Sequence, residues 1–112
     1  MVEMKQVITN GDLFMVDFNE GGLQGKRPCA IVEVNEETVK VCPLTTNIKM
    51  RREHPTLLQL TPNEVNRLKV ASTVVGGQVR EIQQTLLQFK IGQLTKEEYD
   101  QLLQIVQAQP QA

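Results

Sequence analysis

The spacing of apolar segments in the first half of the chain is the feature that most restricts its fold. Three short apolar runs lie at GDLFMVDF (11–18), CAIVEV (29–34) and TVKVCPL (38–44). A glycine-rich loop separates the first two, and the short turn NEE (35–37) separates the last two. Parallel neighbours need a crossover of about a dozen residues or more, usually a helix. The sequence therefore predicts an antiparallel meander of three strands.

The middle of the chain carries weaker signals. TLLQLT (56–61) alternates apolar and polar residues as a strand does. TPNE (61–64) has the pattern of a capping box with Pro at the first helical position, which predicts a short helix around residues 62–68. ASTVVGGQVREI (71–82) predicts another strand, in which the glycines at 76–77 mark a bulge or a close approach of backbone.

The C-terminal region predicts one amphipathic helix over residues 96–107. TKEE (95–98) is a second capping box. Apolar side chains recur at helical spacing at Leu94, Tyr99, Leu102, Leu103 and Val106. The remaining residues, 108–112, are expected to form a frayed tail.

These segments predict a mainly β fold: a small, partly open antiparallel barrel with a short helix and a C-terminal amphipathic helix packed on it. The 112 residues suffice for a single domain, with its core over about residues 10–107. No signal peptide and no stretch of roughly 20 apolar residues is recognisable. We therefore expect a soluble, cytoplasmic protein with no membrane association.

Charge and cysteine content exclude some functions. The formal net charge is −1, so bulk charge does not draw this chain to nucleic acid, and any such contact needs a local basic site. Cys29 and Cys42 have no metal-ligand spacing. Both lie in apolar strand-like runs, so we expect small buried side chains in a reducing compartment and no metal site.

Two basic segments are candidate anion sites. In LQGKRPCAIV (23–32) a Lys-Arg pair runs directly into a proline and an apolar strand. These residues fit either solvated charges in a hairpin loop or a cation on a rigid strand facing an anion. The second segment, 49–54, is the densest positive run, with Lys49, Arg51, Arg52 and His54. It fits a grip on RNA, electrostatic steering, a dock for an acidic partner, or a solvated loop.

Several motifs stand in a fixed order along residues 10–107: GDLFMVDF, GKRPCAIV, VCPLTTNI, GGQVREI and FKIGQLTKEEYDQLLQIV. In this order they resemble the MazF/PemK family of toxin endoribonucleases. The resemblance implies a partly open SH3-like barrel with a C-terminal helix. It also implies a homodimer that cleaves single-stranded RNA in a sequence-specific way without metal or cofactor, and that is restrained by an antitoxin.

RNA can be cut without a metal if its own 2′-hydroxyl attacks the adjacent phosphorus while the protein orients and stabilises the phosphate. Arg27 offers a planar fork of donors suited to a phosphate, and Pro28 restricts the backbone beside it. The resemblance gives this arginine a catalytic role, which we interpret as charge stabilisation because a guanidinium is a poor proton donor. Thr45 matches the family threonine that donates to the scissile phosphate. By spacing alone, a hydroxyl at a strand end is more often a turn cap.

Further residues are candidates for RNA binding. Gln78 matches the glutamine of the family's Gln-Ile-Arg segment, and the two-residue period of a strand places Arg80 on its face. A structural hydrogen-bonding role for Gln78 remains open. The other candidates are Gln24, Lys26, Thr46 and Asn47. His54 falls on no catalytic position of the family pattern, and we leave it out of the catalytic set.

The chain also departs from the family pattern. Its first loop is shorter than usual, with Leu23 where a glutamate is expected, and Gly77 replaces an acidic residue before Gln78. Glu20 and Glu81 are candidate substitutes for the missing base. Two alternatives therefore stay open: a weak or inactive homologue that binds RNA or a partner protein through the same groove, and a toxin that inhibits a protein such as a topoisomerase, as the similar CcdB toxins do.

Overall fold

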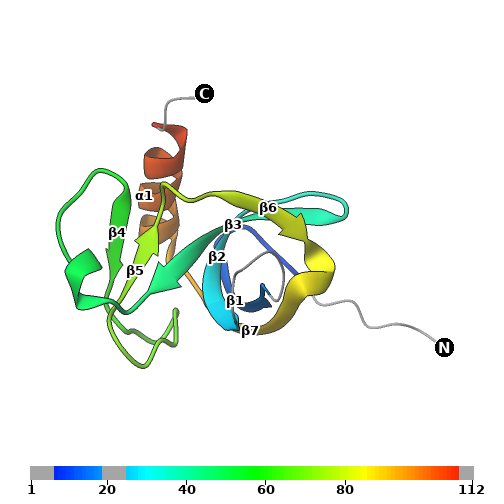
Figure 1. The fold of residues 1–112 in the computed structure, drawn as a ribbon, viewed down its shortest axis with the longest axis horizontal. Coiled ribbons are helices and arrows are strands. Elements are labelled where there is room, and N and C mark those ends of the chain that lie inside the picture. The colour runs from blue at the N-terminus through cyan, green and yellow to red at the C-terminus, as the bar shows by residue number, and fades with distance from the viewer. Residues whose placement is uncertain (1–6, 19–24, 109–112) are drawn as a thin grey trace.

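A computed structural model describes residues 7–18 and 25–108 (Figure 1). They contain seven strands, two short 3-10 helices and one α-helix. In chain order these are β1 (Asp12–Asp17), β2 (Lys26–Val34), β3 (Thr38–Thr45), η1 (Ile48–Met50), β4 (Leu57–Leu60), β5 (Ser72–Val75), β6 (Arg80–Gln83), η2 (Gln84–Leu86), β7 (Leu87–Gln93) and α1 (Lys96–Gln107).

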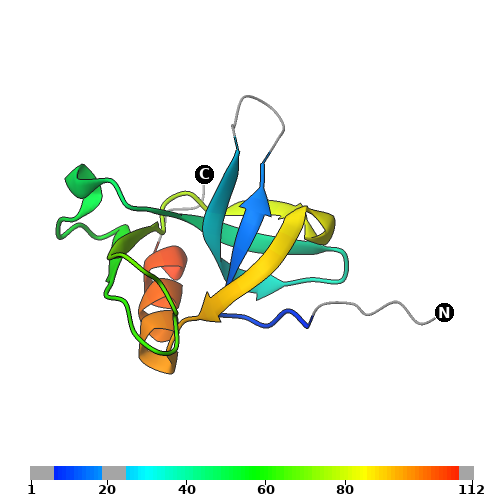
Figure 2. The same cartoon turned by 90° about the horizontal axis from the view of Figure 1, so that it is seen from below.

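The strands form one antiparallel sheet in the order β4-β5-β3-β2-β1-β7, with β6 paired to β3 beside this path. The predicted meander β1–β2–β3 is confirmed, with Leu13 opposite Ala30 and Ala30 opposite Cys42. The sheet curls into a barrel that does not close, and α1 lies beside β4 and β5 (Figures 1 and 2). The predicted mainly β, partly open barrel with a C-terminal helix is therefore confirmed.

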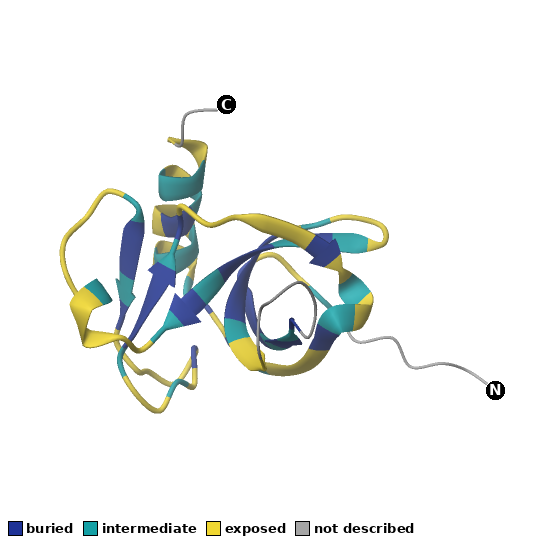
Figure 3. Ribbon diagram, viewed as in Figure 1, coloured by how far each residue is buried: buried dark blue, intermediate teal, exposed yellow. Residues whose placement is uncertain are grey.

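Most buried residues of the described chain lie in the strands (Figure 3), and they form two apolar clusters on opposite faces of the curled sheet. Successive strand residues point to opposite faces, so β2 sends Cys29 and Ile31 into one cluster and Ala30 and Val32 into the other. The barrel cluster is lined by Phe14, Val16, Phe18, Cys29, Ile31, Val39, Val41, Ile82 and Leu87. The second cluster packs beneath α1, where Leu102 is fully buried.

The C-terminal helix begins and ends where its sequence predicts. The Thr95 side chain accepts a hydrogen bond from the Glu98 N–H at 3.1 Å, and the Glu98 carboxylate accepts one from the Thr95 N–H at 2.8 Å. Ala108 caps the other end, and residues 109–112 of the predicted tail lie outside the described residues. None of the helices in the described part of the chain has the length and apolarity needed to span a membrane.

The short helix predicted around residues 62–68 was wrong, because the segment makes a single turn. Asn63, rather than Thr61, supplies the cap: its side-chain oxygen accepts from the N–H groups of Val65 and Asn66. Arg67 then adopts a φ of 56°, which ends any helical path. The capping pattern was present, but an Asn two residues later competed for the same N–H groups.

The strand predicted over residues 71–82 is also wrong as one element, since a turn divides it into β5 and β6. The predicted close approach at Gly76 is present: a Cβ there would lie 2.5 Å from Ile105 Cγ2 and 3.1 Å from the carbonyl oxygen of Thr56. Strand β7 was not predicted, because its exposure pattern does not alternate and its partner β1 is distant in sequence.

Candidate active site

Arg27 lies in a strand rather than in a hairpin loop. Strand β2 begins at Lys26, and cross-strand pairing places Lys26 opposite Asp17 and Arg27 opposite Val16 of β1. The Arg27 side chain is exposed, and no carboxylate of the described residues forms an ion pair with it. The structure therefore fixes the Arg27 backbone in a sheet, as the second interpretation requires, and whether the exposed side chain faces an anion stays a prediction.

Arg27 shares its face of the sheet with the barrel cluster. Paired residues in neighbouring strands point to the same side, and its partner Val16 belongs to that cluster. Phe18, two residues beyond Val16, lies on the same face and is only 5% exposed. Arg27 therefore stands at the rim of the barrel core, next to a buried aromatic ring.

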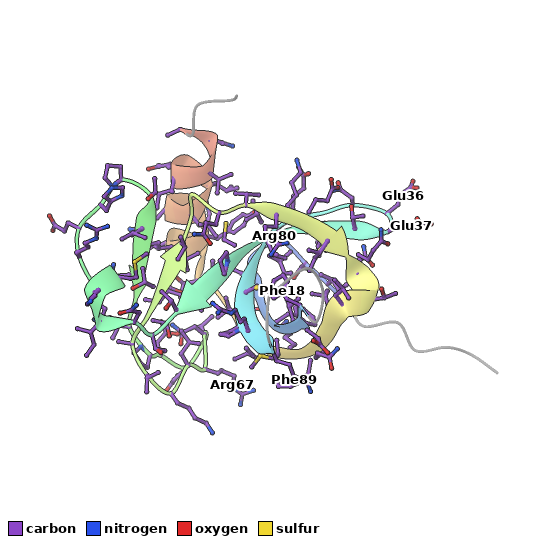
Figure 4. All side chains as sticks on the ribbon, in the orientation of Figure 1. Phe18, Glu36, Glu37, Arg67, Arg80 and Phe89 are labelled. Carbon is purple, nitrogen blue, oxygen red and sulfur yellow. The ribbon has the colours of Figure 1, made fainter. Side chains whose placement is uncertain are left out.

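Arg80 reaches the same rim from strand β6. Its guanidinium carbon lies 5.2 Å from the centroid of the Phe18 ring, a cation–π contact (Figure 4). The neighbouring Glu81 is held elsewhere: its carboxylate accepts hydrogen bonds from the Thr38 hydroxyl at 2.7 Å and the Asn35 amide at 3.2 Å. Glu81 was a predicted substitute for the missing base, but these contacts hold it with Thr38 and Asn35.

Cys29 lies beneath these two arginines. Burial raises the pKa of its thiol to about 12, the neighbouring Cys42 raises it further, and the positive charges of Arg27 and Arg80 oppose the rise. Both guanidiniums therefore lie close enough to Cys29 to act on its ionisation. Its Sγ donates a weak hydrogen bond to the Arg27 carbonyl oxygen at 3.8 Å. Burial also raises the pKa of Cys42 to about 12, and both thiols are free and buried, as predicted.

Thr45 ends strand β3 near the same rim. Cys29 pairs with Pro43, and Arg27 and Thr45 each lie two residues further in the same direction along these neighbouring strands. The Thr45 hydroxyl oxygen accepts a hydrogen bond from the Asn47 N–H at 3.1 Å, so the turn-cap role expected from spacing is present. That bond uses an acceptor site and leaves the hydroxyl hydrogen available for donation.

The remaining predicted RNA-binding residues have no contact with Arg27 or Arg80 among the interactions of the described chain. Thr46 and Asn47 are exposed, and the Asn47 side chain caps η1 by accepting from the Lys49 N–H at 3.0 Å. Gln78 is exposed but lies in the turn before β6, so the predicted strand face shared with Arg80 was wrong. Gln24 lies outside the described residues, as do Glu20 and Leu23.

Side chains of β4 and β5 form hydrogen bonds with the backbone and with each other beneath the basic segment 49–54. The Gln59 amide donates to the carbonyl oxygens of Met50 and Arg52 at 3.1 and 3.0 Å, and the hydroxyl of buried Thr73 donates to the Gln59 side-chain oxygen at 2.9 Å. Lys49, Arg51 and Arg52 are exposed. No carboxylate in residues 7–18 or 25–108 pairs with these three cations.

His54 has a structural contact. Its Nδ1 accepts a hydrogen bond from the Thr56 N–H at 3.2 Å and lies 2.9 Å from the Thr56 hydroxyl. The ring is therefore part of a local turn, and its exclusion from the catalytic set stays a prediction. Phe18 is the contact residue that sequence reasoning missed, although its position two residues after Val16 predicted its face.

The chain is similar to known toxins in sequence and in fold. A family model described as "PemK-like, MazF-like toxin of type II toxin-antitoxin system" matches residues 9–109. The chain belongs to this family. The resemblance inferred from the ordered motifs is thereby confirmed. A comparison with curated proteins found no match.

Solved structures of toxins share the fold. A mycobacterial endoribonuclease in complex with its cognate antitoxin superposes with a TM-score of 0.71 at 19% identity, covering 89% of this chain and 91% of that one. The toxin MazF-mt6 of Mycobacterium tuberculosis gives 0.67 at 22% identity, covering 85% and 91%. A MazE–MazF structure from Deinococcus radiodurans gives 0.70 at 16% identity, covering 91% and 93%. At these identities the likeness shows the fold alone.

Proposed function

We propose that this chain is a toxin that cleaves single-stranded RNA without a metal ion, with Arg27 and Thr45 as its catalytic residues. Membership of the toxin family supports the activity. The observation that carries the assignment of the site is Arg27 itself. It is fixed in a sheet at the rim of the barrel, with no carboxylate partner among the described residues. A phosphate diester is the anion that RNA would bring to it.

The reaction needs the groups of the RNA, donors of the protein and solvent water. The 2′-hydroxyl gives its proton to water as its oxygen attacks the adjacent phosphorus, the new P–O2′ bond forms and the P–O5′ bond breaks, and the leaving 5′-oxygen takes a proton from water. The products are a 2′,3′-cyclic phosphate and a 5′-hydroxyl. Arg27 stabilises the charge that develops on the non-bridging oxygens. The Thr45 hydroxyl, oriented by the Asn47 N–H, donates its hydrogen to one of them.

RNA binding extends along the rim on both sides of this centre. Lys26 precedes Arg27, and Thr46 and Asn47 follow Thr45, while Gln24 and Gln78 are further candidates. Arg80 also lines an open cleft of ≈ 500 Å³ along β6, together with Thr38 and Glu81. The exposed cations Lys49, Arg51 and Arg52 continue the track beyond Asn47, where they meet phosphates rather than bases.

Partners follow from the same proposal. A mycobacterial endoribonuclease of this fold was solved with its cognate antitoxin, and the Deinococcus structure contains MazE together with MazF. We propose that this chain also has an antitoxin, forms a homodimer and acts in the cytoplasm.

One observation favours a second candidate, a homologue that binds RNA without cutting it. The predicted replacement base Glu81 is bound to Thr38 and Asn35 on the other side of β6 from Arg80.

The third alternative, a toxin that inhibits a protein target, has less support. Such a toxin would use an apolar patch at the helix end, and the large exposed hydrophobic side chains of the described residues all lie outside α1.

Incubation of a long, mostly unstructured RNA in EDTA tests the proposal. The wild type should make discrete cuts, and Arg27→Ala, folded to the same extent, should make none. Sequencing of the product ends then gives the preferred site. If both folded proteins leave the RNA intact in EDTA and in magnesium, and no antitoxin is bound, the non-cleaving alternative holds.

A further inference from the structure

The rim of the barrel carries two guanidinium groups from strands that are distant in sequence. Arg27 comes from β2 and Arg80 from β6, and both point to the side of the barrel cluster. Ile82, two residues after Arg80, is a member of that cluster, as is Val16, which pairs with Arg27. Both side chains therefore lie on the barrel side of the sheet, and both are close enough to Cys29 to act on its thiol.

The floor beneath them is apolar and neutral. Phe18 is 5% exposed and Cys29 is fully buried. The Cys29 thiol stays protonated at neutral pH, since burial raises its pKa, and both arginines act on it electrostatically. No carboxylate of the described residues pairs with either guanidinium. Two like charges close to the same thiol repel each other, and an anion placed between them relieves that repulsion.

The Phe18 ring fixes one of the two cations. Arg80 lies over the ring at 5.2 Å from its centroid, a contact that limits the rotamers of an otherwise exposed side chain. A guanidinium is weakly hydrated and stacks on aromatic faces, so it keeps its outward donors free while its flat face rests on the ring. Figure 4 shows Phe18 within the ring of barrel strands and Arg80 beside it on β6.

We propose that Arg27 and Arg80 bind one phosphate between them, and that Phe18 is the positioning residue that holds Arg80 for this purpose. The inference rests on the proposed function for its natural ligand, a phosphodiester of single-stranded RNA. It adds a second arginine to the same phosphate and a buried aromatic residue that acts only through that arginine.

Titration with inorganic phosphate at constant ionic strength tests this site without RNA. The arginine Nε–Hε signals of the folded protein are followed by NMR, with chloride in the reference series. In the wild type, the Arg27 and Arg80 signals should shift along one binding curve. Phe18→Leu should weaken phosphate binding by about two- to five-fold, the range expected for loss of a cation–π contact. Phe18→Tyr, which keeps the ring, should restore it.

Phe14→Leu is the matched control. Phe14 lies on β1, just before Phe18 in the chain and in the same cluster; it is fully buried, and no cation of residues 7–18 or 25–108 lies over its ring. The same substitution there should destabilise the core and leave phosphate affinity of the folded protein unchanged. In an Arg80→Gln background, Phe18→Leu should have no further effect on binding, because its partner is already gone.

Three results would overturn the inference: phosphate shifts the Arg27 signal alone, the Phe14 and Phe18 variants weaken binding equally, or the Phe18 effect persists without Arg80.

The shared phosphate site and the proposed ribonuclease activity can fail separately. If phosphate binds to both arginines and RNA remains uncut, only the proposed ribonuclease activity fails. If RNA is cut and the Arg80 signal does not respond to phosphate, only the shared phosphate site fails.

Discussion

The two buried thiols predict a loss of stability in mild alkali. Burial raises the pKa of Cys29 and of Cys42 from 9.0 to about 12 in the folded chain. Above pH 9 the unfolded chain releases both protons, while the folded chain keeps them until about pH 12. The stabilising difference is therefore complete below pH 9 and is lost as the pH rises toward 12.

The expected loss of unfolding free energy follows from the raised pKa values of the two thiols. Each thiol lowers the free energy of unfolding by about 1.4 kcal/mol for each pH unit above 9. At pH 10 the two thiols together should cost about 3 kcal/mol relative to pH 8, a large part of the stability of a small domain, which is roughly 5–15 kcal/mol.

Urea unfolding of the wild type and of Cys29→Ala/Cys42→Ala at pH 8, 9 and 10 measures this effect. The double variant should be less stable at pH 8, because methyl-sized cavities remain, but its stability should fall less between pH 8 and 10. Tyr99, whose pKa burial also raises, titrates in both proteins and cancels from the comparison. Parallel pH profiles for the two proteins would refute the reasoning.

Three further predictions concern packing and RNA. Gly92→Ala should lower the free energy of unfolding by about 1–3 kcal/mol, because the alanine Cβ would clash with the Asn66 carbonyl oxygen; wild-type urea stability would contradict this. Thr45→Ser should keep RNA cleavage, whereas Thr45→Val should lose about a hundred-fold in single-turnover rate, and equal rates would contradict a donating hydroxyl. Arg51→Gln/Arg52→Gln should reduce the slope of log affinity against log salt by about 1.4, measured with 2′-O-methyl RNA; an unchanged slope would exclude phosphate contacts there.

The elements predicted correctly are those whose signals are local. The strands of the meander are neighbours in sequence, and the helix 96–107 carries its own capping box, so each needed only a few adjacent residues to be recognised. The error at 62–68 arose where two local signals competed, since Asn63 displaced Thr61 as the cap. Strand β7 was missed because its pairing with β1 is long-range and its burial does not alternate.

In the candidate site too, features with a local sequence signal were predicted, and contacts between distant strands were not. Arg27 is a candidate because of its place before Pro28 and the apolar run, and its catalytic role stays a prediction. The contact of Arg80 with Phe18 was not recognisable, because it depends on how two distant strands meet across the barrel. The turn-cap role of Thr45 followed from its position at a strand end, and the structure shows that this bond leaves its hydrogen free. The hydrogen bonds of Glu81 with Asn35 and Thr38 also cross between strands and had no signal in the sequence.

The most direct test of the proposed activity is the chemistry at the cut bond. A short RNA containing the mapped site is incubated with the wild type in EDTA, beside a copy with a single 2′-deoxyribose on the 5′ side of the scissile phosphate. We predict that mass spectrometry finds a 2′,3′-cyclic phosphate on the product of the first RNA and that the second remains intact. Cleavage of the deoxy-substituted RNA at the same bond and rate would contradict attack by the RNA's own hydroxyl.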